Sequence, residues 1–194
     1  MDMDKSIVSE VFKNISFSKK DIDFIYSKFE KITLKKGDVL INPDVFVRHQ
    51  YYIHSGCLRS YFFHKSGKEY TIQFAVKDWW ISDYTSFFTS EKSILYVECI
   101  QDAVIYKLSK EDSDKICFLF IKIELFFKEK LEKAFASFQR RILDYLSKSA
   151  KERYLQFIEG YPDIEQHVKN YHIASYLGIT TESLSRVRKK QRGN

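Results

Sequence analysis

The spacing of hydrophobic and polar positions changes along this chain, from a β-type pattern between about residues 32 and 108 to a helical pattern after residue 109. Before about residue 32, apolar residues at helical spacing predict a short helix over 18–31. From there to about residue 108, short runs of β-branched and aromatic residues are typical of a β-barrel, roll or sandwich. The expected strands cover 39–41, 50–54, 58–63, 70–74, 95–100 and 103–107, with turns at 36–38, 42–44, 55–56, 65–67 and 101–102.

A helical pattern follows residue 109 and becomes regular between about 121 and 146. Apolar residues recur there every three or four positions and form one stripe. The stripe could pack on the β-region of its own chain or on a second copy of the helix. A helix this long would extend beyond a barrel of the expected size, so we favour a dimer interface. Its expected residues are Phe127, Leu131, Ala134, Phe138, Ile142 and Tyr145.

Residues 172–190 predict two short helices joined by a tight turn. Gly178 suits a position with positive φ, and Thr180 suits the N-cap of the second helix. Leu184 and Val187 lie about one turn apart and face the interior, whereas the remaining side chains of this helix are mostly polar. This is the pattern of a helix-turn-helix, although an ordinary helical hairpin with a basic tail would share part of it.

Charge is unevenly distributed along the chain. Residues 139–194 hold 11 Lys and Arg against 6 Asp and Glu, whereas residues 1–138 hold 21 against 20. Lys and Arg also occupy five of the seven positions from 186 to 192. A basic surface confined to one region is expected of a domain that binds nucleic acid phosphates.

Composition narrows the class of protein. With 44% hydrophobic residues in 194, the chain can form a core, and its apolar runs are too short to span a bilayer. The acidic first six residues lack the pattern of a signal peptide, so we expect a cytoplasmic protein without a membrane partner. Its three Cys and five His show no metal-binding spacing, so we expect no metal, no cofactor and no enzymatic activity.

Several stretches, taken in order, resemble the Crp/Fnr family of bacterial transcription regulators. They are YYIHSGCLRS at 51–60, SGKEYTI at 66–72, QRRIL at 139–143 and the helix-turn-helix at 172–190. The resemblance covers most of the chain, and YHIASYLGI at 171–179 is closest to a branch common in Bacteroidetes. The helix-turn-helix alone is moderately specific, and the three parts in this order are strongly so.

The resemblance implies an α+β fold with three parts. Residues 1–115 would form a sensory β-roll, a jelly-roll-like double-stranded β-helix similar to cyclic nucleotide-binding domains. Residues 116–147 would form the dimerisation helix, and residues 148–194 a winged-helix-like helix-turn-helix domain that binds DNA.

The effector pocket is where this chain departs from the family pattern. In members that bind cyclic nucleotides, a Glu holds the ribose and an Arg neutralises the phosphate. Here Asp83 stands in place of the Glu, the Arg is missing at Ser93, and Lys92 would face the other way in a strand. We therefore expect an effector other than cyclic AMP, or a filled remnant without one. The pocket residues implied are Arg59, Tyr61, Trp80, Ser82, Asp83, Lys92 and Ser93.

The resemblance also assigns the DNA-binding residues. Glu182 and Arg186 match positions that contact bases, where Glu accepts from cytosine and Arg donates to guanine. Thr181 replaces an Arg of the cyclic AMP receptor, so the preferred half-site should differ. Residues expected to contact phosphate or to flank the base contacts are Thr180, Ser183, Ser185, Arg188 and Lys189.

We therefore expect a homodimeric regulator that binds a palindromic site in double-stranded DNA, with RNA polymerase and an unknown small-molecule effector as further candidate partners. Two other classes stay open. One is a regulatory or adaptor module that binds a nucleotide but no DNA. The other is a cupin-like metalloenzyme that uses His49 and His54, for which no sequence motif provides support.

Overall fold

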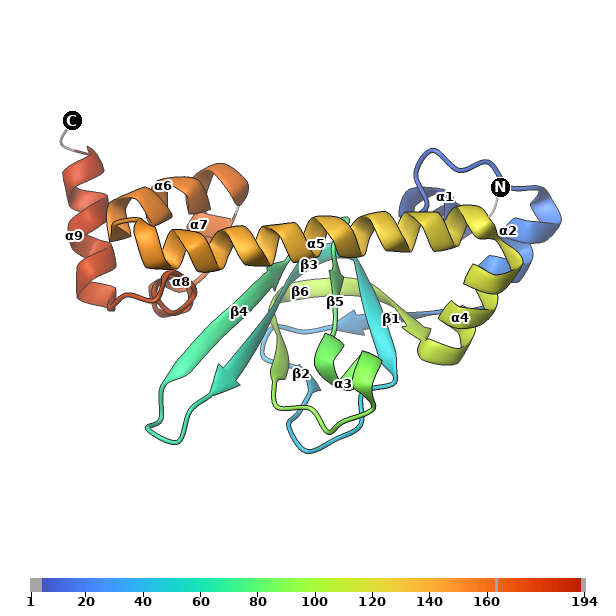
Figure 1. The fold of residues 1–194 in the computed structure, drawn as a ribbon, viewed down its shortest axis with the longest axis horizontal. Helices are drawn as coiled ribbons and strands as arrows, with labels where there is room; N and C mark the ends of the chain where they lie inside the picture. Colours follow the sequence, from blue (N-terminus) through green and yellow to red (C-terminus); the bar gives the residue numbers. More distant parts are fainter. Residues whose placement is uncertain (1–4, 163, 193–194) are drawn as a thin grey trace. The chain divides into compact units, whose positions relative to one another are not determined.

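The computed structural model describes residues 5–162 and 164–192, without the side chains of Gln166, His167 and Arg192. The outermost residues of the expected sensory and DNA-binding domains therefore lie outside the described part. The chain forms two compact units that interleave along the sequence. The first contains Met1–Ser60 and Phe74–Glu132, and the second contains Tyr61–Gln73 and Lys133–Asn194. Figure 1 labels the helices and strands of both units in chain order.

The strands form one six-stranded sheet. Its main path runs β1-β6-β3-β4, while β2 pairs with β6, and β5 pairs with β3. The pairings of β1 and β2 with β6, and of β5 with β3, are antiparallel. The strands are β1 (Phe29–Leu34), β2 (Val39–Ile41), β3 (His49–Phe63), β4 (Glu69–Ala75), β5 (Trp80–Ile81) and β6 (Tyr96–Ser109).

Strands β3 and β6 each run through a site that the sequence predicts as a turn, so the turns expected at 55–56 and 101–102 are wrong. Gly56 has a φ of 88°, and a Cβ at this position would lie 2.3 Å from the carbonyl oxygen of Asp102. Glycine is thus required because two long strands approach each other closely, and not because the chain reverses.

The amino-terminal helical pattern is only partly confirmed. Helix α2 (Lys19–Tyr26) begins at the Ser18 capping box, but it ends before Phe29, where β1 starts. In the first unit the sequence also missed two short helices, α1 (Ser6–Val11) and α3 (Tyr84–Thr89).

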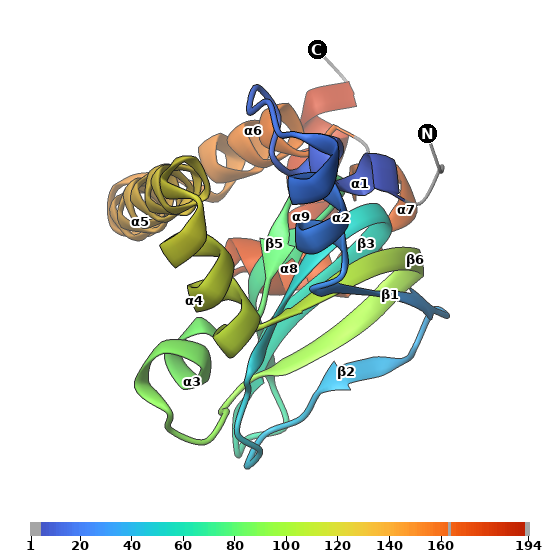
Figure 2. The same ribbon diagram turned by 90° about the vertical axis from the view of Figure 1, so that its right-hand side faces the viewer.

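Two hydrophobic clusters form the core of the first unit. One lies among the strands and includes Ile53, Leu58 and Val97. The other packs α1, α2, α4 (Lys110–Leu119) and the start of α5 (Ile121–Ser147) against the strands. Figure 2 shows α1 and α2 beside the strands. Side chains that alternate along a strand thus supply both clusters.

Helices make up the rest of the chain. The predicted long helix is confirmed as α5 (Ile121–Ser147), and the Ser149–Glu152 capping box starts the next helix, α6. Within the described residues no strand follows Ser109, so α9 has no β-wing there. The remaining helices are α6 (Ala150–Gly160), α7 (Ile164–His167), α8 (Asn170–Leu177) and α9 (Thr181–Arg192).

Candidate nucleic-acid interface

Helices α8 and α9 form the helix-turn-helix predicted from the sequence. Gly178 ends α8 in the left-handed conformation, with φ 65° and ψ 34°. A Cβ at this position would lie 2.3 Å from the ring of Tyr145 on α5, so glycine is required for both conformation and space. Thr180 begins α9, because its Oγ1 accepts the backbone N–H of Ser183 at 3.2 Å.

Helix α9 has one buried side and one exposed side. Leu184 is fully buried on the side that faces α8 and α6. The exposed side carries Glu182, Ser185, Arg186, Lys189 and Lys190, while Thr181 and Ser183 are half-buried at its margin. We call Glu182, Ser185, Arg186 and Lys189 the outward row of α9, and three of these four residues are charged.

Short polar contacts orient the outward row. The Nη2 of Arg186 donates to the Ser183 hydroxyl at 3.1 Å, which holds the guanidinium along the helix. The backbone N–H of Glu182 itself and the hydroxyls of Thr180 and Thr181 lower the pKa of the Glu182 carboxyl, so it stays ionised. The row therefore presents one carboxylate near the start of the helix and cations further along it.

Arg188 does not belong to this row, although the sequence suggested that it contacts phosphate. Its Nε lies 3.3 Å from the Tyr154 hydroxyl and 3.3 Å from a carboxylate oxygen of Glu165. Its Nη1 donates to the side chain of Asn170, and only 17% of the Arg188 side chain is exposed. Arg188 therefore takes part in the packing of α9 against α6, α7 and α8, and its predicted phosphate contact stays a prediction.

The long helix α5 carries a second exposed surface, which is apolar. Leu131, Phe138, Ile142 and Tyr145, all predicted for the dimer interface, are exposed in the chain, as is Ala134. The sequence missed five further large apolar residues that are exposed on this helix, Ile121, Leu125, Phe135, Leu143 and Leu146. We call Leu131, Phe135, Phe138, Ile142, Tyr145 and Leu146 the apolar stripe of α5.

Phe127 lies apart from this stripe. The centroid of its ring lies 5.2 Å from that of Trp80 and 5.9 Å from that of Phe12. Phe127 thus belongs to the hydrophobic cluster that packs α1, α2 and α4 against the strands. It therefore helps to hold α5 to β5 and to Phe12, the residue that follows α1.

The polar residues of the expected effector pocket are bonded within the protein. Asp83 is 1% exposed, and its Oδ1 accepts the backbone N–H groups of Thr85 and Ser86 at 3.0 and 3.3 Å. Its Oδ2 accepts the Ser93 hydroxyl at 2.8 Å and the Ile94 N–H at 3.2 Å. Oδ1 thus caps α3, and Oδ2 ties the start of α3 to Ser93 and Ile94. A ribose hydroxyl would need a free acceptor on this carboxylate.

The other residues expected in this pocket have varied surroundings. Arg59, also 1% exposed, forms an ion pair with Glu98 at 2.7 Å, and the Ser82 hydroxyl donates to the carbonyl oxygen of His49. Trp80 packs in the helical cluster and Lys92 is exposed. Tyr61 belongs to the second unit. The structure thus brings Ser93 and Asp83 into contact. Trp80 lies elsewhere, because Trp80 and its neighbour Ile81 on β5 pack into different hydrophobic clusters.

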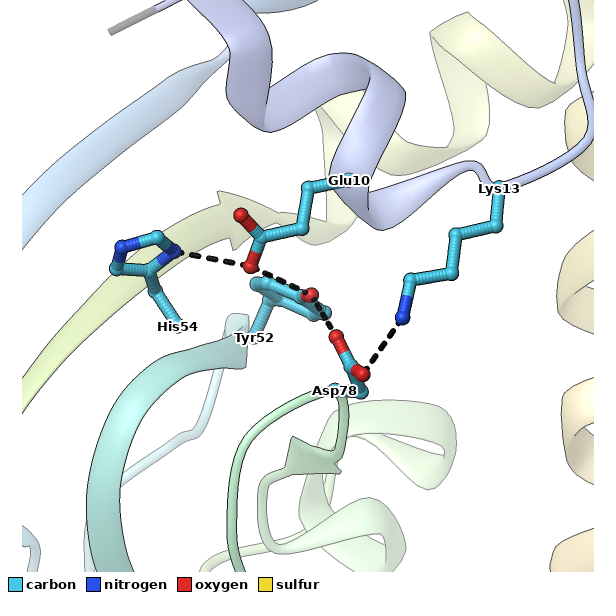
Figure 3. A network of polar contacts seen from close by, with 5 residues as sticks. All are labelled: Glu10, Lys13, Tyr52, His54 and Asp78. Carbon is cyan, nitrogen blue, oxygen red and sulfur yellow. Dashed lines mark hydrogen bonds and ion pairs between the residues drawn. The ribbon is translucent and has the colours of Figure 1, made fainter. Parts of the chain in front are cut away.

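A polar network joins α1 to the strands of the first unit (Figure 3). The Tyr52 hydroxyl donates to Asp78 at 2.7 Å and lies 3.1 Å from Glu10, which also contacts the Nδ1 of His54 at 2.9 Å. Burial and the two carboxylates raise the pKa of Tyr52. For Asp78, burial opposes the hydrogen bonds from Lys13 and Tyr52, but the net effect lowers its pKa.

The described residues hold neither a metal-binding cluster nor a membrane-spanning helix. No group of three or more His, Cys, Asp or Glu side chains lies close enough to hold a metal ion. None of the described helices combines the length and the apolar composition needed to span a membrane.

Comparison with known protein families gives a match over the β-region of the chain. The family model of the cyclic nucleotide-binding domain matches residues 31–118. No curated protein sequence matches the chain.

Solved structures share the fold over most of the chain. FixK2 from Bradyrhizobium japonicum superposes with a TM-score of 0.74 at 16% identity, over 85% of this chain and 85% of that one. A CooA variant from Carboxydothermus hydrogenoformans gives a TM-score of 0.74 at 17% identity, over 95% of this chain and 83% of that one. A protein described as a transcriptional regulator of the Crp/Fnr family, from Eubacterium rectale, gives 0.68 at 19% identity, over 91% and 84%.

Proposed function

We propose that the chain is a homodimeric transcription regulator that binds specific DNA sequences, because residues 31–118 match the model of the cyclic nucleotide-binding domain and the chain shares the fold of Crp/Fnr regulators. The observation that carries this proposal is the outward row of α9. It places ionic and hydroxyl groups on the exposed side of the second helix of a helix-turn-helix, which is the side that enters a major groove.

Within this proposal the residues of the outward row have different roles. Arg186 donates two hydrogen bonds to a guanine, and Glu182 accepts from a cytosine amino group. Lys189 and Ser185 contact phosphates, which orients α9 without selecting a sequence. Thr181, half-buried at the margin of the row, contributes to the preference at a neighbouring base pair.

The apolar stripe of α5 supports the dimer. Phe135 and Leu146 are 72% and 77% exposed in the single chain, and exposed apolar side chains at coiled-coil spacing are stabilised by a second helix. Two copies related by a two-fold axis would each place one α9 helix in a major groove. The DNA site should therefore be palindromic, with half-sites about 10 base pairs apart.

We propose further that the effector, if the protein uses one, is not cyclic AMP. The two oxygens of Asp83 already accept four hydrogen bonds from the chain, and Arg59 is paired with Glu98. A cyclic phosphate would then lose its hydration without gaining a counter-ion there, which is unfavourable.

Selection of bound sequences from random duplex DNA tests the proposed function. We expect the purified full chain to enrich a palindromic consensus without added nucleotide, and we expect cyclic AMP to leave the enrichment unchanged. Recovery of sequences without a consensus, at a level that salt abolishes, would contradict sequence-specific binding. A consensus obtained only with cyclic AMP would contradict the proposal on the effector.

A further inference from the structure

Strands β3 and β4 form a hairpin, and we call Tyr61–Gln73 its tip. The tip belongs to the second unit, together with Lys133–Asn194, which contains the helix-turn-helix. Strand β4 ends the main path of the sheet, so one edge of the strand is not covered by a further strand of that path. The backbone N–H and C=O groups along such an edge need other partners when they are buried.

Ser175 on α8 supplies partners for this edge. The backbone N–H of Thr71 donates to Ser175 Oγ at 2.8 Å, and the Thr71 hydroxyl lies 3.2 Å from the same oxygen. The Ser175 hydroxyl in turn donates to the carbonyl oxygen of Glu69 at 2.7 Å. Thr71 is only 1% exposed, so these bonds are shielded from water. One serine thus uses its donor and both acceptor positions on a single strand.

Arg141 on α5 makes a second connection to the same strand. Its guanidinium donates to the carbonyl oxygens of Ile72 and Thr71, the latter at 2.9 Å. It also donates to the carbonyl oxygen of Tyr176 at 3.2 Å and lies over the Tyr176 ring at 4.0 Å. Only a planar guanidinium has enough donors at fixed angles to join α5, β4 and α8 in this way.

We propose that the hairpin tip, Ser175 and Arg141 form a latch that fixes the helix-turn-helix at the end of α5, and that the latched arrangement is the one that binds DNA. The proposal rests on the proposed function. Helix α8 packs directly on α9, so a bond that holds α8 also limits the orientation of α9.

The direction of the effect follows from exposure and entropy. Glu182, Ser185, Arg186 and Lys189 remain exposed while the latch is closed, so the latch does not cover the outward row. A reading helix that is already held in one orientation loses less conformational freedom when it binds. Strands β3 and β4 continue from the tip into the first unit, so a change in those strands can reach α8 through the latch.

Two variants open the latch in different ways. Ser175→Ala removes the hydroxyl and keeps the helix, while Arg141→Lys keeps the charge and removes the planar fork. Matched controls change the same residue types elsewhere in the second unit. Ser147→Ala removes a hydroxyl that bonds only within α5, and Arg140→Lys alters the exposed neighbour of Arg141.

The experiment measures two quantities on the full-length chain. Amide hydrogen exchange at Thr71, without DNA, should become about threefold to tenfold faster in both latch variants, as expected for the loss of one hydrogen-bonded contact. The Kd for the duplex selected by the unaltered protein should weaken by about the same factor. The controls should change neither quantity.

Several outcomes would overturn the latch. Unchanged exchange at Thr71 in both variants would show that the contacts do not restrain the hairpin. Faster exchange with an unchanged Kd would remove the link to DNA, and a tighter Kd would show that the contacts restrain binding instead. Hydrogen exchange at Thr71 is measured without DNA, so it tests the latch contacts independently of the proposed function. If the unaltered protein selects no duplex, the proposed function fails and with it the DNA part of the latch, whether or not the contacts hold.

Discussion

The expected effector pocket and the outward row of α9 carry similar polar residues but use them differently. In the pocket region, four donors from the chain occupy the carboxylate of Asp83, which is 1% exposed. On α9, Glu182, Arg186 and Lys189 are exposed, and Arg186 donates a hydrogen bond to the Ser183 hydroxyl at 3.1 Å. The polar groups of the pocket region are therefore used within the fold, whereas the cations of the outward row remain exposed to a partner. Resemblance to a family motif therefore locates the polar residues of a site. Whether these residues can bind a ligand or DNA depends on the hydrogen-bonding groups that the fold leaves exposed.

The largest expected effect comes from the apolar stripe of α5, which must be covered by a second copy if α9 is to read two half-sites. Phe138→Glu places a charge within the stripe, and we expect it to convert the dimer to a monomer because the carboxylate would lose its water at the interface. Sedimentation velocity measures the change directly.

The control for this variant is Ala136→Glu, which introduces the same charge at an exposed position of α5 outside the stripe. It should leave the dimer intact. A dimer in both variants would show that the stripe is not the interface.

The next effect separates a structural carboxylate from a ligand-binding one. Asp83→Asn replaces one charged acceptor by an amide donor that faces N–H and O–H groups, so we expect the free energy of unfolding to fall by about 2–3 kcal/mol. Urea denaturation measures this loss. Unchanged stability together with altered nucleotide binding would mean that Asp83 serves a ligand after all.

A smaller effect tests the division between the two sides of α9. Arg188→Ala removes the contacts to Tyr154, Glu165 and Asn170, and we expect it to lower stability by about 1–2 kcal/mol. Arg186→Ala should leave stability almost unchanged, because Arg186 is exposed. Thermal unfolding of both variants decides the matter, and equal losses would contradict the assignment of the two arginines to different sides.

The smallest effect concerns the polar network that joins α1 to the strands. Folding lowers the pKa of Asp78 below its ordinary value of 3.8. The stability that this carboxylate contributes is therefore present above that value and is lost as the pH falls through the lowered pKa. Between about pH 5 and 3, Asp78→Asn should lose stability less steeply than the unaltered protein. Parallel slopes in urea titrations over that range would exclude the contribution.

Local signals made the helical half of the chain predictable. The Ser149 capping box, Gly178 and Thr180 each fix a helix end through neighbouring residues, and the structure confirms all three. The spacing of apolar residues was likewise enough to locate α5. Such features depend on residues close in sequence, which a single chain displays in full.

The β-region was harder to predict because its signals depend on distant strands. Gly56 has the composition of a turn, and only the position of Asp102 on β6 reveals that it permits close contact. The surroundings of Asp83 likewise depend on residues ten and eleven positions further along.

The position of Arg188 on the packed side of α9 could also have been predicted from the sequence. Arg188 follows Leu184 by four residues and therefore lies on the inward side of the helix, where charge alone suggested DNA contact. The same spacing argument would have found Phe135 and Leu146 on α5.

The measurement that tests the central claim most directly is a comparison of binding energies at every base pair of the selected site, for the unaltered protein and for Arg186→Ala. If the outward row of α9 reads DNA, the variant should lose about 1–3 kcal/mol of discrimination at one base pair in each half-site and keep the preferences elsewhere. An equal loss on all sequences, or an unchanged pattern of preferences, would contradict the claim that Arg186 reads a base.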